Sequence, residues 1–386
     1  PYIMKKVFFL LFFSIAIYAQ NKTESFDSEK LSEKREITIS LPPSYEKNTS
    51  KKYPILVLLD GDFLFDPFYG AITYGSYWDD FPETIIIGIH QNHNDERVDD
   101  TEYDDAQGLP AEKGAAFYEF IGQELLPYIE KKYRVAPFRM IAGLDTTAGY
   151  LNFFLYKENP IFNAYISLNP DLAPLMEKRV AEQLSAAKSP VFYYLSTSED
   201  EIKQIAEPIK MLNDNIKKDN NPLVNYKFES FKGAGHYSQT LYAIPSALHQ
   251  IFETYKPISS LEFSNKIALL PSGYVDYLEK KYSTLNEALH LDVPIRINDF
   301  KAIEAAILKN NAFSELDQLA ILADKYYPKS MLAEYELGLM YEKQEDYKKA
   351  MKRYQNASQM QEIGALTKTM MLEKYDLMLS KNAPKK

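Results

Sequence analysis

The sequence contains no cysteine and only five histidines among its 386 residues. Without cysteine the protein has no disulfide, no thiol nucleophile and no cysteine for lipid attachment. Basic residues are also in the minority, because 44 Lys and Arg face 54 Asp and Glu for a formal net charge of −10. Such an acidic balance argues against nucleic acid or an anionic membrane as the partner.

Long apolar runs are also missing after the first 19 residues, so we expect no membrane span in the mature chain. Residues 1–19 have the pattern of a signal peptide: Lys5 and Lys6 precede an apolar run from Val7 to Ile17, and Ala19 supplies a small residue for cleavage. The run is shorter than the roughly 20 residues that a membrane anchor needs. We expect export to a bacterial periplasm or to the medium, which the lack of cysteine also favours.

Residues 35–256 alternate between strand-like and helix-like segments. Residues 53–59 and 84–89 are continuous apolar runs, which indicate strands buried on both faces of a parallel sheet. Helical periodicity follows in residues 112–132, and further strands are expected at 138–142, 163–168, 190–195 and 224–231. The pattern predicts an α/β fold, a mostly parallel sheet flanked by helices, with ligands at the carboxyl ends of the strands.

The segments on either side of this domain have a different composition. Residues 20–34 are polar, so we expect a disordered lead-in. Residues 257–272 lack a clear period and are interpreted as a linker to an all-helical domain at 273–386. Seven residues of that domain have the spacing of one tetratricopeptide repeat: Leu337, Gly338, Tyr341, Tyr347, Ala350, Tyr354 and Ala357. A generic helical bundle is the alternative. We expect this part to pack on the α/β domain or on a second copy, and its helices could bind a protein partner.

The most informative segment is Gly143-Leu144-Asp145-Thr146-Thr147. It follows the apolar strand at 138–142 and precedes a helical stretch at 150–156. A strand, a sharp turn through glycine and a helix form the context that presents the nucleophilic serine of an α/β-hydrolase. In this chain the residue at the apex is Asp145, a carboxylate.

The other catalytic candidates follow later strands. His236 lies in a glycine-rich loop after the last expected strand, where an imidazole can reach the elbow. The acid should follow the strand at 190–195, and Glu199 is the first choice with Asp200 second. The polar and acidic residues that follow this strand are also typical of a helix capping box, so a capping role stays open as the alternative.

The oxyanion and substrate pocket is assigned to residues after the central strand and at the elbow: Gly61, Asp62, Phe63, Thr146 and Trp78. The aromatic residues that follow Phe63 could line a pocket, although such clusters are more typical of core packing. His90 and His93, with Asp95 and Glu96, have some features of a metal site, but no distant third ligand is indicated. We therefore expect no metal and no cofactor.

Together these motifs resemble the putative esterase family, which includes esterase D and enterochelin esterases. The resemblance covers about residues 35–255 and rests on short motifs in the right order: Leu41-Pro42-Pro43, Leu59-Asp60-Gly61, the elbow, and the Gly-x-Gly before His236. It implies an α/β-hydrolase fold that cleaves carboxylic esters of small molecules with a Ser-His-acid triad. The Gly-His-Ser of the family is replaced here by Gly143-Leu144-Asp145.

This replacement leaves several functions open. His236 and the altered elbow could still support ester hydrolysis. Asp145 could instead cap the following helix in a non-catalytic protein that binds a ligand or a partner. As a nucleophile, Asp145 would form a poor anhydride with an ester carbonyl, but it could attack saturated carbon to form an alkyl-enzyme ester. Thr146 or Thr147 as nucleophile is a further alternative, although both are displaced from the apex.

Overall fold

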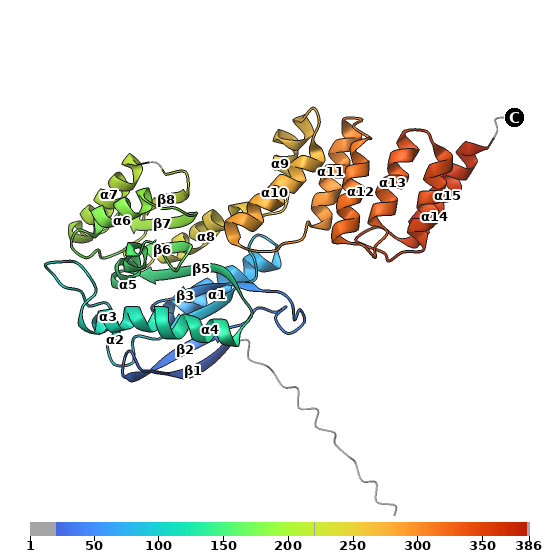
Figure 1. Ribbon diagram of the computed structural model, residues 1–386. Coiled ribbons are helices and arrows are strands. Elements are labelled where there is room, and N and C mark those ends of the chain that lie inside the picture. The colour runs from blue at the N-terminus through green and yellow to red at the C-terminus, as the bar shows by residue number, and fades with distance from the viewer. Residues whose placement is uncertain (1–20, 220, 384–386) are drawn as a thin grey trace, which may run out of the picture.

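The computed structural model describes residues 21–219 and 221–383, and the predicted signal peptide lies outside them. The described chain forms an α/β domain and a helical domain that extends from one side of it (Figure 1). The α/β domain has one eight-stranded sheet, in the order β1-β2-β4-β3-β5-β6-β7-β8. Its strands are β1 (Asn21–Ser28), β2 (Glu33–Ser40), β3 (Tyr53–Leu58), β4 (Ile85–Ile89), β5 (Val135–Leu144), β6 (Ala164–Leu168), β7 (Val191–Ser198) and β8 (Val224–Phe231).

The sheet is parallel from β4 to β8 and antiparallel at β1 and β2. Strands β3 and β4 are buried throughout, as their continuous apolar sequences predict. Leu56 on β3 lies opposite Ile86 on β4 and Met140 on β5, which fixes the register at the centre of the sheet. The predicted α/β-hydrolase fold is confirmed.

Helices cover both faces of the sheet. The first face packs against α1 and α8, and the second packs against α3, η1, α4, η2, α6 and α7. The bounds are α1 (Gly61–Tyr77), α2 (Glu96–Asp100), α3 (Glu112–Glu119), η1 (Phe120–Leu125), α4 (Leu126–Lys132), α5 (Thr146–Tyr150), η2 (Leu151–Tyr156), α6 (Met176–Ser185), α7 (Lys203–Lys218), α8 (Thr240–Ile251) and η3 (Glu253–Tyr255).

Residues 20–34 were expected to be disordered, but β1 occupies most of this segment and pairs with β2 along its whole length. The ring of Phe26 packs edge-on against Phe120 at 5.5 Å and Tyr128 at 5.2 Å. Ser28 donates a hydrogen bond to Glu124. Backbone pairing and one well-packed aromatic ring therefore order a segment whose composition is polar.

The helical domain contains α9 (Ser260–Asn265), η4 (Ile267–Leu269), α10 (Tyr274–Leu289), α11 (Ile297–Lys309), α12 (Glu315–Tyr326), α13 (Leu332–Lys343), α14 (Tyr347–Ser358) and α15 (Lys368–Asn382). Consecutive helices from α11 onward stand side by side in Figure 1. The ring of Tyr354 on α14 packs so tightly on Gly338 of α13 that a Cβ there would lie 2.6 Å from it. The helical region agrees with the sequence, while its assignment to tetratricopeptide repeats stays a prediction.

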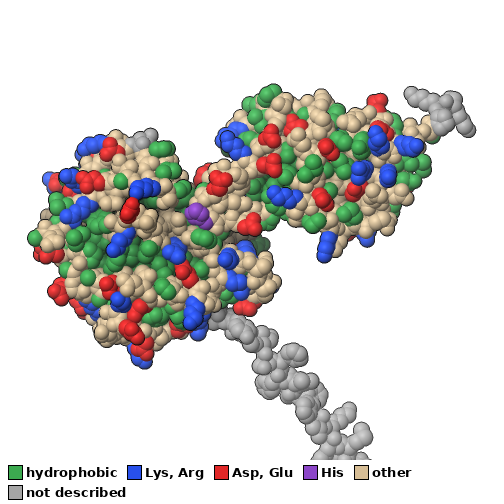
Figure 2. All heavy atoms as spheres, in the orientation of Figure 1, with side chains coloured by type: hydrophobic (Ala, Val, Ile, Leu, Met, Phe, Trp, Pro, Cys, Tyr) green, Lys and Arg blue, Asp and Glu red, His purple; other side chains and the backbone are tan. Residues whose placement is uncertain are grey.

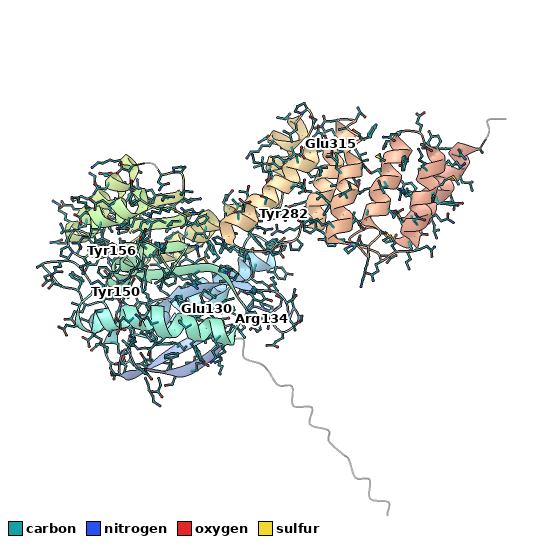
Figure 3. All side chains as sticks on the ribbon, in the orientation of Figure 1. Glu130, Arg134, Tyr150, Tyr156, Tyr282 and Glu315 are labelled. Carbon is teal, nitrogen blue, oxygen red and sulfur yellow. The ribbon has the colours of Figure 1, made fainter. Side chains whose placement is uncertain are left out.

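The junction between the domains is packed, and the segment 257–272 that the sequence suggests as a linker carries α9, η4 and the buried Ile267. Helix α10 belongs to both cores, since Leu285 and Leu289 join the α/β core whereas its first half joins the helical core. Tyr282 of α10, labelled in Figure 3, lies near this junction. Beside it, NH2 of Arg296 lies 3.2 Å from Oδ1 of Asp79 on the α/β domain.

Acidic and basic side chains are interspersed on the face shown in Figure 2, which has no large region of one sign. Within the part of the chain that the structure describes, no helix is both long enough and apolar enough to cross a bilayer.

Candidate active site

Asp145 stands at a sharp turn between β5 and α5 with φ 58° and ψ −119°, a conformation that L-residues rarely adopt. A Cβ on Gly143 would lie 2.7 Å from the backbone carbon of Thr147, so glycine is required for this close turn. The strained backbone of a nucleophile elbow is therefore present with a carboxylate at its apex.

The loop after β8 brings His236 to this turn, with Nε2 3.6 Å from Oδ1 of Asp145. The other ring nitrogen, Nδ1, lies 2.8 Å from Oε2 of Glu201. Asn169, just after β6, donates a hydrogen bond to the same Glu201 oxygen. Burial alone would raise the pKa of Glu201, but the hydrogen bonds from Asn169 and the Ile202 backbone and the contact with His236 outweigh burial and lower it. Asp145, His236 and Glu201 thus form a line of acid, imidazole and acid.

The carboxylate beside His236 is Glu201, whereas the sequence suggested Glu199 or Asp200. Strand β7 continues to Ser198, three residues beyond its expected end, and the two expected acids fall in the exposed turn that follows. Of the three consecutive acids Glu199, Asp200 and Glu201, only Glu201 turns back toward the imidazole. Asn169 was missed as well, because a single asparagine after a strand carries no catalytic signal in a sequence.

Arg97 on α2 is the third residue that sequence reasoning missed. Its NH1 donates to Oγ1 of Thr146 at 2.8 Å and lies 3.5 Å from Oδ2 of Asp145, and its NH2 donates to the carbonyl of Leu144 at 2.8 Å. Arg97 therefore places a positive charge next to the carboxylate at the apex. The acid-rich segment 95–105 gave no sign that its one arginine reaches the elbow.

Asp60, at the end of β3, is the buried partner of Arg97. Nε of Arg97 lies 2.7 Å from Oδ1 of Asp60, and Thr147 donates its hydroxyl to Oδ2 at 2.6 Å. Burial raises the pKa of Asp60, although Arg97 and Thr147 act in the opposite direction. The turn that the sequence assigns to Gly61 has its left-handed residue at Asp60, with φ 54° and ψ 42°. Gly61 is instead needed for packing, because a Cβ there would lie 2.7 Å from Gly88.

The remaining pocket candidates separate into near and distant residues. Phe63 lies in the first turn of α1, next to the site. Asp62 binds the loop after β4: it contacts Nδ1 of His90 at 3.1 Å and accepts from the Gln91 backbone at 2.8 Å, and although burial opposes the shift, these contacts lower its pKa. Trp78 follows α1, a helix of 17 residues and so about 25 Å long, which places it away from the elbow.

The two threonines after Asp145 have structural hydrogen bonds. Thr147 is buried and accepts from the backbone N–H of Leu144 at 2.9 Å while it donates to Asp60. The carboxylate of Asp145 makes no capping hydrogen bond to α5, contrary to the capping alternative. It faces Arg97 and His236. Among the described residues, no group of three or more His, Cys, Asp or Glu side chains is placed to hold a metal ion.

A pocket of about 500 Å³ adjoins the site between the first turns of α1 and α8. Its apolar walls are Phe63, Leu64, Pro67, Leu144, Tyr237 and Leu241. A larger cavity of about 730 Å³ lies at the domain junction, lined by Pro54 and Pro137 among others. Because these prolines are near the amino ends of β3 and β5, that cavity is at the opposite edge of the sheet from Asp145.

Residues 28–175 match the family model described as Putative esterase. The match lies within the α/β domain and agrees with the resemblance to the putative esterase family that the sequence motifs carry. A solved structure of an uncharacterised protein from Capnocytophaga ochracea is similar over both domains: identity is 29%, coverage is 94% of this chain and 100% of that chain, and the TM-score is 0.85. A search of curated proteins finds no match.

Two structures with lower sequence identity share the fold of the α/β domain. An IroE-like serine hydrolase from Shewanella oneidensis is 20% identical, with 79% of this chain and 99% of that chain covered and a TM-score of 0.61. The siderophore hydrolase EstA from Aspergillus nidulans is 15% identical, with 66% and 99% covered and a TM-score of 0.52. The family-model match and these two structures agree on an esterase-like α/β-hydrolase fold for the domain.

Proposed function

We propose that this protein is an exported hydrolase of ester-type substrates in which His236, oriented by Glu201, is the general base and Asp145 replaces the elbow serine. The observation that carries the proposal is the elbow backbone of Asp145 with Nε2 of His236 3.6 Å from its carboxylate. A strained turn of this kind has a stability cost and persists where the surrounding structure enforces it.

On a carboxylic ester, the productive route uses water. His236 takes a proton from a water molecule at Nε2 while the water oxygen attacks the ester carbonyl, and the proton then passes to the departing alcohol. Glu201 accepts a hydrogen bond from the proton on Nδ1 and so leaves Nε2 free to act as base. Arg97 supplies positive charge next to Asp145, and this partly offsets the repulsion between that carboxylate and the developing oxyanion.

On a substrate with a leaving group on saturated carbon, Asp145 acts as the nucleophile. One carboxylate oxygen forms a bond to carbon as the leaving group departs, which gives an alkyl-enzyme ester. Water activated by His236 then attacks the Asp145 carboxyl carbon, releases the alcohol and restores the carboxylate. Both routes use the same three residues and differ in the atom that the water attacks.

A non-catalytic binding protein is the second candidate. It is favoured by the two contacts of the apex carboxylate, since Arg97 at 3.5 Å and His236 at 3.6 Å hold Asp145 between two nitrogen groups. In that case the pocket or the helical domain would bind a ligand or a protein partner without turnover.

The first experiment is hydrolysis of 4-nitrophenyl butyrate and octanoate by the chain without residues 1–19. His236→Ala, Asp145→Ser and the control His93→Ala, an exposed histidine, are measured in parallel. Turnover above buffer that His236→Ala abolishes and His93→Ala retains supports catalysis. No turnover in the native protein together with a gain in Asp145→Ser supports the binding protein, because the rest of the machinery would then be intact.

Heavy-oxygen water distinguishes the two chemical routes in a single turnover. Attack on the ester carbonyl places the label in the carboxylic acid product and leaves the protein unlabelled. Hydrolysis of an alkyl-enzyme ester places the label in Asp145, which mass spectrometry of the peptide that contains residues 140–150 would detect. Label in neither would contradict both routes.

The proposed export and partner binding have their own tests. Lys5, Lys6 and the run from Val7 to Ile17 support export, which cell fractionation would test with and without residues 1–19. For partner binding, a truncation after residue 291 is the informative one, because it keeps Leu285 and Leu289 in the esterase core. A partner captured by the full chain and lost by the truncated chain supports the proposal, and equal capture overturns it.

A further inference from the structure

The 500 Å³ pocket beside the elbow is apolar, and its polar groups are already bonded within the protein. Three polar residues reach its lining: Asn92, Arg97 and Thr240. Asn92 donates its amide to Asp62 at 3.0 Å, and Thr240 is buried with its hydroxyl next to Gln239. A ligand group that enters this pocket thus meets few polar groups that are free to bind it.

Arg97 is the only cation of the lining, and its donors have partners. Nε binds Asp60, NH1 binds Thr146, and NH2 contacts both Asp60 and the Leu144 carbonyl. An anionic ligand would have to compete with the fully buried Asp60 for this guanidinium. The charge that remains close by is acidic, because the carboxylates of Asp62 and Asp145 are at the same edge of the sheet.

Exposed apolar side chains line the pocket. Tyr237, which follows His236 in the chain, is 69% exposed. Leu241 and Phe63, on opposite walls of the pocket, are 66% and 46% exposed as well. Large apolar side chains that are exposed and converge on a concave site are typical of ligand binding.

We infer that the substrate of this site is uncharged and carries an alkyl or aryl group that binds between Phe63 and Leu241, while anionic substrates are excluded. That this ligand is a substrate rests on the proposed function. The pocket would bind the same alkyl or aryl group even if the protein did not turn it over. The specificity of the pocket comes from the apolar area that the ligand buries and from the acidic groups around it. The guanidinium of Arg97 binds residues of the elbow and not the ligand.

The test measures binding separately from catalysis, by calorimetric titration of the full chain with butanamide, hexanamide and octanamide. Amides resist hydrolysis and keep the carbonyl. We expect the affinity to rise by about threefold to fourfold for each methylene, the ratio expected for burial of one CH₂ group. An octanamide analogue with a terminal carboxylate should bind at least about tenfold more weakly, because burial of an unpaired charge is unfavourable.

Two variants and a matched control locate the binding. Leu241→Asp and Phe63→Ala should remove most of the chain-length dependence, whereas Leu261→Asp, at an exposed leucine of α9, should retain it. Circular dichroism verifies that each variant is folded. Affinity that does not change with chain length, equal binding of the carboxylate analogue, or equal effects of Leu241→Asp and Leu261→Asp would overturn the inference. If octanamide binds as expected and no ester is hydrolysed, the pocket stands and the proposed catalysis fails.

Discussion

Nε of Arg97 lies 2.7 Å from Oδ1 of Asp60, and this ion pair joins the end of β3 to the loop that carries α2. Asp60 is fully buried, and its other oxygen accepts the hydroxyl of Thr147 on α5. Three segments that are far apart in the chain therefore meet at one carboxylate next to the elbow. The ion pair between Arg97 and Asp60 therefore helps to hold the strained turn at Asp145 in place.

Arg97→Met should destabilise the esterase domain by about 3–5 kcal/mol, because it leaves a buried charge without its partner. The double variant Asp60→Asn with Arg97→Met should recover part of this loss, since no unpaired charge then remains. Urea denaturation measures the free energies of unfolding. Lys178→Met, at an exposed site on α6, is the control and should stay within about 0.5 kcal/mol of the native protein. Similar losses in Arg97→Met and Lys178→Met would show that the pair is unimportant.

Glu201→Gln should shift the His236 ring toward the tautomer with its proton on Nε2, because the carboxylate 2.8 Å from Nδ1 is lost while the Asn169 amide, 2.9 Å from the same nitrogen, can only donate to it. The nitrogen chemical shifts of the imidazole report this directly, without a substrate. Where an ester is hydrolysed, kcat should fall by about 100-fold or more. Glu199→Gln, two residues away in the exposed turn, is the matched control and should leave both readouts unchanged. The opposite pattern would restore Glu199 as the acid.

Glu336 on α13 should make the helical domain less stable as pH rises. It is fully buried, and neither of its carboxylate oxygens has a hydrogen-bond partner. Burial raises its pKa well above the ordinary value of 4.5, and the neighbouring carboxylate of Glu304 on α11 raises it further. Lys301 and Lys374 near Glu304 lower the pKa of Glu304 but leave it raised by burial. Since the folded state binds the proton more tightly, stability is highest below pH 4.5 and declines as pH rises toward the raised value.

The variant Glu336→Gln mimics the protonated side chain and should flatten this decline. At pH 7 to 8 it should be more stable than the native protein by about 1–3 kcal/mol, because the native side chain must there bind a proton or bury a charge on folding and glutamine needs neither. Thermal unfolding between pH 5 and 8 tests this, with the exposed Glu373→Gln on α15 as control. A native Tm that does not fall with pH would refute the prediction.

Gly338→Ala and Gly70→Ala should have effects of opposite sign. A Cβ at Gly338 would lie 2.6 Å from the Tyr354 ring, so the helices α13 and α14 must separate at a cost of about 1–3 kcal/mol. A Cβ at Gly70 on α1 meets nothing within 4 Å, and the better helix propensity of alanine should stabilise that helix by about 0.5–1 kcal/mol. Thermal unfolding of both variants checks the pair, and the same sign in both would contradict the packing argument.

The parts of the fold that were predictable are those with strong local patterns. The apolar runs of β3 and β4 have no polar face, so they could only be central strands. The turn at Gly143 and Asp145 was recognisable because a strand-like segment and a helix-like segment flank this glycine in the sequence, and the structure shows that a Cβ on Gly143 has no room. Strand β1 was missed because its order comes from pairing with β2, which its own polar residues do not reveal.

The sequence alone determined the α/β order of elements, the esterase resemblance, the carboxylate at the apex and the loop of His236, since each depends on neighbours within a few residues. Only the tertiary structure decided that Glu201 contacts His236 and that Arg97 pairs with Asp60 beside the elbow. Those partners are separated by 35 and 37 residues along the chain. Which of several carboxylates or cations reaches a site depends on where strands end and how loops turn, and chain spacing does not encode this.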